Sequence, residues 1–429
     1  TGAFSGMRRE VKAVKVRPFL KRTAFFLAAA AGSVMLLFVH GVSPAYGAQG
    51  SAAAEETEAD SGSSQGEGGP SVQEEVLDGL SELDFSQVER FLEQSQWGES
   101  GFSFEELLLT LLKGDFAGAF SQALSGLKAA LFSELSSGTR LMTQVLLISM
   151  AGAVFSCFSD IFSGGQISET AFYVTFLLLF SLLAASFYGS LSIAGEAISG
   201  VLGFMKTLAP AYFMAVSFTG GGLSAAAGCE WMLLSITAVE WLLSTFLLPL
   251  TKVYILLVLA GHLTKEELFS RMTVLIKNII EWSLKTVTGI VLGFQLLQGM
   301  VLPYADAIKN VSIQRLISVI PGIGQGASAI SQMVLGSGIL IKNTVGAAAA
   351  VVLILLTAVP LLKLLILMAL YHGLAAVTEP VCDKRIAACI SDMGKAHQIL
   401  IRLVLTSAFL FIISIGVICM TSNTAYYAG

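Results

Sequence analysis

The chain has 429 residues, of which 55% are hydrophobic and only 13% are charged. Soluble domains carry about 25% charged residues, so this composition excludes an ordinary water-soluble globular protein and favours an integral membrane protein. The formal net charge is -5 at pH 7 and no basic patch is present, so nucleic-acid binding is not expected. The cysteines form no closely spaced pair and lie in or beside apolar segments, which favours buried thiols over a disulfide framework.

Residues 1–47 have the composition of an export signal. A cluster of Lys and Arg between Arg8 and Arg22 precedes an apolar stretch from Thr23 to Val39, and small residues follow at 45–48. This order is typical of a cleavable signal peptide, with an uncleaved anchor helix as the alternative. Both interpretations place the following segment outside the cytoplasm.

Two segments of different character separate the signal from the membrane domain. Residues 48–70 are rich in Ala, Ser, Gly and Glu, so we expect a disordered acidic linker. Residues 71–138 have apolar residues at helical spacing, and Ser103 with Glu106 matches a capping box. We therefore expect a small extracytoplasmic region of amphipathic helices that pack on each other, on the membrane surface or on a partner protein.

Residues 139–429 form an all-α polytopic membrane domain in this interpretation. A transmembrane helix needs about 20 apolar residues. Segments 199–228 and 312–343 are apolar but broken by Pro and Gly. If both re-enter from one face, the fold has about six transmembrane helices and two re-entrant segments; if both cross, it has eight spans. The six unbroken segments are Leu141–Ile161, Thr170–Ile193, Trp231–Ala260, Thr286–Leu302, Val345–Val377 and Leu400–Met420.

The polar loops 261–285 and 378–399 carry several Lys and Arg residues each. Positively charged loops remain in the cytoplasm. Both loops share that side only if an even number of crossings separates them, which the re-entrant arrangement provides. The basic residues Lys206 and Lys342 argue against it, because the same arrangement places them near the outer face.

An internal repeat of about 111 residues connects the two broken segments. Pro210 and Pro321 differ by this offset, as do Pro249 and Pro360, and Lys252 and Lys363. The local strings are PLTKVYILLVL and PLLKLLILMAL. Apolar helices also resemble one another by chance, so coincidence is the alternative to a repeat.

Non-helical backbone at membrane depth must be sheltered by protein or line a water-filled path. The broken segments therefore indicate either a substrate path or a close packing seam, since small residues also permit tight helix contacts. Charged residues inside spans are candidates for function. We expect Glu240 to pair with Lys252 or Lys363, or to face a lumen. The candidate pore or packing positions are Pro210, Glu240, Lys252, Pro321, Gly322, Gly324, Pro360 and Lys363.

The sequence contains no motif of a known catalytic or cofactor site. None of the histidines has metal-ligand spacing, and no phosphate-binding loop, dinucleotide fingerprint or nucleophile elbow occurs. We therefore expect neither an enzyme nor a bound cofactor or metal.

The string FEELLLTLLKGDF at 104–116 and the long string from IPGIGQG to AAVTEP at 320–380 resemble the stage III sporulation protein AE family. The resemblance is most specific over 318–397 and brings no catalytic residues. It implies a multi-pass protein of the mother-cell membrane that faces the forespore. It also implies partners among other stage III sporulation membrane proteins and a forespore membrane protein, within a secretion-like channel or feeding tube.

Three functions remain open at this point. The first is a membrane subunit of the sporulation channel, the second a solute transporter or permease-like subunit, and the third a structural scaffold that recruits partners through residues 71–138. All three involve contact with membrane lipid, and the sequence leaves homo-oligomerisation open.

Overall fold

A computed structural model describes residues 72–95, 103–113, 140–154, 166–219, 222–263, 269–318 and 324–427. Every regular element within these ranges is a helix, which confirms the all-α prediction. The expected signal peptide at 1–47 and acidic linker at 48–70 lie outside the described residues.

Three short helices come first: α2 (Val72–Ser81), α3 (Ser86–Gln94) and α4 (Phe104–Leu112). Ser103 caps α4, because its hydroxyl oxygen accepts a hydrogen bond from the Glu106 amide at 3.3 Å. The Glu89 carboxylate of α3 accepts from the Ser103 hydroxyl at 2.8 Å and from the Glu105 amide at 2.9 Å. The start of α4 is therefore held both by its own cap and by α3.

The later elements are much longer than the short helices. They are α6 (Gln166–Ser217), α7 (Gly222–Glu240), the π-helix η2 (Trp241–Leu247), α8 (Leu248–Gly261), α9 (Ser270–Ser318), α10 (Gly324–Thr378) and α11 (Lys384–Tyr427). Within the described residues, four helical stretches could cross a membrane by length and composition: Phe172–Ser217, Ala225–Gly261, Gly336–Thr378 and Lys384–Met420. The first contains 46 residues, so it rises about 69 Å, against about 30 Å for a hydrocarbon core.

Proline does not interrupt these helices as the sequence suggested. Pro210 lies inside α6, and the helix ends only at Ser217 before the glycine-rich turn. Pro360 likewise lies inside α10. Of the two breaks expected in segment 199–228, the one at Pro210 is therefore wrong, and α6 ends shortly before the glycines at 220–222.

The Pro249 region is accommodated differently. Proline has no amide hydrogen to donate, and the turn before it widens into η2, where the Leu248 amide donates to the Leu243 carbonyl five residues back. The segment from Gly222 to Gly261 therefore continues as one helical stretch.

Most of the second broken segment, 312–343, belongs to the end of α9 and the start of α10. Helix α9 ends at Ser318 and α10 begins at Gly324, while Pro321 and Gly322 lie outside the described residues. The re-entrant arrangement, the repeat and the number of spans stay predictions. The helix Arg140–Val154 is apolar but shorter than a span, and residues 155–161 of the first expected span are outside the described ranges.

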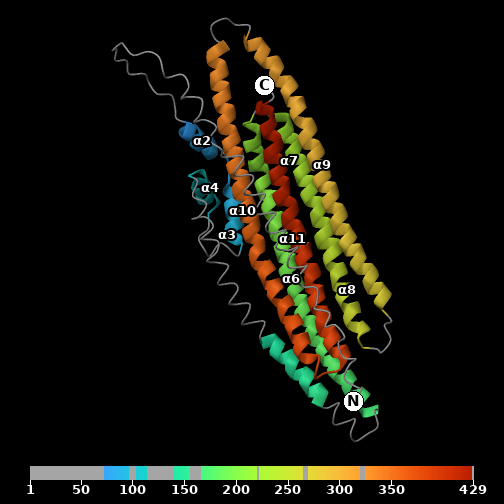
Figure 1. Ribbon diagram of the computed structural model, residues 1–429. Coiled ribbons are helices and arrows are strands. Elements are labelled where there is room, and N and C mark those ends of the chain that lie inside the picture. The colour runs from blue at the N-terminus through green and yellow to red at the C-terminus, as the bar shows by residue number, and fades with distance from the viewer. Residues whose placement is uncertain are drawn as a thin grey trace, which may run out of the picture. The chain divides into compact units, whose positions relative to one another are not determined.

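Helices α6, α10 and α11 pack against one another, and α9 packs against α7, α8 and α11 (Figure 1). In the most apolar 18-residue segments of α10 and α11, 61% of the residues are buried, whereas 28% are buried in the corresponding segment of α6. The two C-terminal helices therefore form the centre of the bundle.

Aromatic side chains attach the short helices to the bundle. The rings of Phe91 and Phe104 lie 6.2 and 6.3 Å from the fully buried ring of Phe204 on α6. The absence of a side chain at Gly203 lets Phe91 approach α6, because a Cβ there would lie 2.8 Å from the ring. Gly79 of α2 similarly admits the side chain of Ile341 on α10. The described short helices contact each other, as one of the three expected arrangements has it, and they also pack on the chain's own long helices, which was not expected.

Candidate functional site

The charged residue Glu240 is paired, but with a partner that the sequence analysis did not propose. The Lys206 ammonium of α6 lies 2.6 Å from the Glu240 carboxylate at the end of α7. The expectation that Glu240 pairs with Lys252 or Lys363 was therefore wrong. Both side chains are 41% exposed, so the pair lies on the outside of the bundle. Pairing lowers the cost of placing two charges in an apolar segment.

Lys252 also lies on the surface of the bundle. Its ammonium group sits 4.7 Å from the ring centroid of Tyr188 on α6, in cation–π geometry. Lys252 contacts Tyr188 of α6, and Glu240 contacts Lys206 of the same helix. Tyr188 and Lys206 are 18 residues apart, which is about 27 Å along a helix. The two charged positions therefore cannot belong to one site.

The proline and lysine positions of the expected repeat differ in burial. Pro210 is exposed, whereas Pro360 is buried and Lys363 is half-buried on α10. Gly324 is the first residue of α10. The described structure does not gather the candidate positions around a common cavity, so their roles in a path or a seam stay predictions.

A buried polar cluster joins α6, α10 and α11. The hydroxyls of Ser186 and Tyr371 lie 2.6 Å apart, and the Ser190 hydroxyl lies 2.8 Å from Nε2 of His397. Nδ1 of His397 lies 2.8 Å from the Met393 carbonyl oxygen. A carbonyl can only accept, so Nδ1 carries the proton, and in the neutral ring Nε2 accepts from Ser190. The cluster fixes the ring and links three helices.

A second buried cluster involves the same three helices further along. Lys342 of α10 is fully buried, and its ammonium donates to the Cys419 carbonyl of α11 at 3.1 Å. The Tyr212 hydroxyl of α6 lies 3.1 Å from the Cys419 sulfur. Gly346 allows this approach, because a Cβ at that position would lie 2.7 Å from the same sulfur.

Sequence reasoning missed both clusters, although each left a trace in the sequence. Ser186 and Ser190 are one helical turn apart in an apolar segment, and His397 and Lys342 are polar residues in largely apolar surroundings. Small polar residues on apolar helices commonly hydrogen-bond across helix interfaces. The spacing could therefore have indicated a polar contact, but not its partners.

Four further side-chain atoms are buried without a hydrogen-bond partner in the described part of the chain. They are Oε1 of Gln295, Nε2 of Gln298, Oδ1 of Asn343 and Nε2 of His372. A buried polar atom without a partner costs about 1–3 kcal/mol, so each of these atoms marks a place where water or a ligand would be stabilised.

The two basic loops lie together at one end of the long helices. Nε2 of His262, just after α8, lies 2.9 Å from the Asp392 carboxylate of α11, and the Lys395 ammonium lies 2.6 Å from the same side chain. Glu281 of α9 pairs with Arg402 of α11. This agrees with the prediction that both loops share one side of the membrane; which compartment that is stays a prediction.

Comparison with known proteins gives a consistent result. The family model described as stage III sporulation protein AE matches residues 102–422. The stage III sporulation protein AE of Bacillus subtilis (strain 168) is 23% identical over 317 residues, which cover 74% of this chain and 79% of the relative. No solved structure matches the chain. The matched residues include α4 and every long helix of the bundle, and the chain belongs to the stage III sporulation protein AE family.

Proposed function

We propose that this protein is a membrane subunit of a channel complex that joins the mother cell to the forespore during sporulation. The observation that carries the proposal is the family match over residues 102–422, which includes all of the long helices except the last residues of α11. The four long apolar stretches support a multi-pass location. Family likeness further favours the mother-cell membrane, with other stage III proteins and a forespore membrane protein as partners.

The interior of the bundle supports conduction in preference to a purely structural role. Gln295 and Gln298 on α9, and Asn343 and His372 on α10, contribute buried polar atoms without partners. In a purely apolar seam such atoms would only destabilise the fold. In a complex that admits water or a solute between helices, they would gain hydrogen bonds. Both helices pack against α11 and not closely against each other, so in this proposal the path lies beside α11.

The scaffold function predicts that the short helices α2–α4 contact a partner. Their apolar side chains Phe91 and Phe104 already contact Phe204 of α6. A partner that binds here would therefore meet the polar faces of these helices. This arrangement is compatible with a scaffold role in addition to the channel role.

The proposal is tested in the bacterium that encodes the chain. Deletion of the gene is expected to block heat-resistant spore formation and late forespore gene expression, with vegetative growth unaffected. Re-expression of the wild type should restore both, with protein levels matched by immunoblot. Normal sporulation together with a vegetative uptake defect would refute the channel role and favour the solute-transporter alternative.

Substitutions then test the path inside the protein. His372→Leu and Gln295→Leu replace an unpaired polar group by an apolar one, which should leave the protein level unchanged and reduce spore yield. Leu296→Ala on the exposed side of α9 is the matched control. Full sporulation of both path variants would remove these residues from the proposed path.

A further inference from the structure

A cavity of about 510 Å³ lies between α8, α9 and α11, where the two basic loops meet. The four basic side chains that line it are Lys277, Lys384, Arg385 and Lys395. One carboxylate, Asp392, also lines the cavity and is already in contact with a histidine and a lysine. The described residues that line the cavity therefore carry an excess of positive charge.

Two of the lysines are available to a ligand. Arg385 and Lys395 are each paired with an aspartate. Lys277 and Lys384 have no ion-pair partner among the described residues, and both are exposed. Two lysines from different helices, α9 and α11, therefore line the same cavity without an ion-pair partner among the described residues.

The start of α9 adds to this charge. Helix α9 begins at Ser270, which lines the cavity. The first amides of a helix lack partners within the helix, so this start carries a partial positive charge. Helix α11 also begins at the cavity, but its Arg385 amide already donates to the Asp383 carboxylate at 2.8 Å, so α11 contributes the Lys384 side chain and not its first amides.

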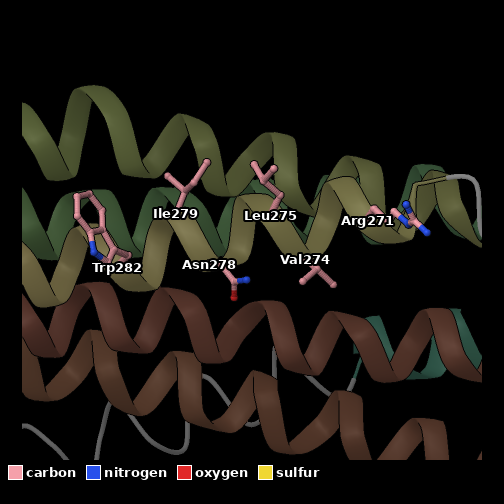
Figure 2. Close-up of a pocket in the computed structure, with 6 residues that line it drawn as sticks. All are labelled: Arg271, Val274, Leu275, Asn278, Ile279 and Trp282. Atoms are coloured by element: carbon pink, nitrogen blue, oxygen red, sulfur yellow. The ribbon is translucent and has the colours of Figure 1, made fainter.

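An apolar groove continues from the cavity along α9. Val274 lines both the cavity and a second, shallow pocket that includes Leu275, Ile279 and Trp282. Figure 2 shows Leu275 and Ile279 next to each other along α9, with Arg271 at the end of the row. The Leu275 and Trp282 side chains are 55% and 68% exposed. Large apolar residues exposed beside a basic cavity are expected at the boundary between headgroups and acyl chains.

We propose that this surface binds one anionic phospholipid. Its phosphate occupies the cavity between Lys277 and Lys384, and an acyl chain follows the groove past Leu275 and Ile279 to Trp282. A free phosphate would use the lysines without the groove, and a neutral lipid would use the groove without the lysines. Because the basic cavity and the apolar groove meet at Val274, one ligand with both an anionic headgroup and an acyl chain fits them better than either alternative.

Quenching of Trp282 fluorescence by brominated acyl chains tests the proposal in the full-length protein. Trp97, Trp231 and Trp241 are replaced by Phe, and the protein is placed in phosphatidylcholine nanodiscs. The share of brominated lipid is then varied and the quenching of Trp282 is recorded. Brominated phosphatidylglycerol should reach half of its maximal quenching at a share about tenfold lower than brominated phosphatidylcholine. Inorganic phosphate should not displace the brominated lipid.

Charge-neutral variants test whether Lys277 and Lys384 bind the lipid phosphate. Lys277→Gln with Lys384→Gln should abolish the preference for phosphatidylglycerol. The matched control, Lys285→Gln with Lys113→Gln, removes the same charge from exposed positions outside the cavity and should retain it. Equal quenching by both lipids, loss of the preference in the control, or displacement by inorganic phosphate would each overturn the proposal. Gel filtration and the unfolding midpoint of each variant verify that the fold is retained.

Discussion

Docking of the short helices on the bundle depends on a close contact at Gly203. A Cβ at this position would lie 2.8 Å from Cε2 of Phe91, against 3.4–4 Å in ordinary van der Waals contact. In Gly203→Leu the leucine side chain must occupy the space of the Phe91 ring, so the ring has to leave its position against α6, either alone or together with α3. Overpacking of this kind costs about 1–3 kcal/mol.

The same change at Gly200 is a matched control. Gly200 lies on α6 within one turn of Gly203, and a Cβ there would meet nothing within 4 Å. Both variants replace glycine by a good helix former, so both gain a similar helix propensity. The difference between Gly203→Leu and Gly200→Leu therefore isolates the contact with Phe91.

Limited proteolysis measures the effect. Trypsin cleavage after Arg90 or Lys113 requires local opening of α3 or α4, and a cost of about 1–3 kcal/mol raises the open population about 5- to 150-fold. The cleavage rate in membrane vesicles should rise by this factor in Gly203→Leu and stay near the wild-type rate in Gly200→Leu. Equal cleavage rates in both variants would refute the docking of α3 on α6.

Polar contacts between the long helices give three further predictions. Lys206→Ala leaves Glu240 unpaired in an apolar segment, so it should lower the unfolding midpoint in detergent. The double variant Lys206→Ala, Glu240→Gln should lower it less, because no unpaired charge remains; a decrease equal to the sum of those of the two single variants would contradict the pairing. Ser190→Ala removes the partner of His397 Nε2 and should cost about 1–3 kcal/mol of unfolding free energy, with an unchanged value arguing against the contact. Tyr371→Phe removes one hydroxyl from the same cluster and should cost about 0.5–1.5 kcal/mol in the same titration, whereas stabilisation would contradict the bond to α6.

Local features of the fold could be predicted from sequence because each depends on residues a few positions apart. The cap at Ser103 is an example: the accepting oxygen and the Glu106 amide are three residues apart. The all-α class follows similarly from apolar composition alone. The break expected at Pro210 was wrong, since a proline inside a long packed helix can be tolerated when neighbouring helices hold it.

The contacts of the candidate site depend on pairs that are distant in the chain. Lys206 and Glu240 are 34 residues apart, and Ser190 and His397 are 207 apart. Such pairs follow only from knowing which helices are neighbours and how they are aligned along their axes. Apolar helices have little variation in sequence with which to specify that alignment, so the correct partner of Glu240 could not be chosen among several lysines.

The length of the stretch Phe172–Ser217 has a consequence for how a partner in an opposing membrane would be reached. Its rise of about 69 Å exceeds the hydrocarbon core by about 23 Å along the membrane normal even at a tilt of 40°. At least one end of the stretch therefore projects about 11 Å or more beyond the hydrocarbon core. For a protein that is anchored in a second bilayer and docks on the projecting end, the aqueous distance between the two membranes is shortened by the length of that projection.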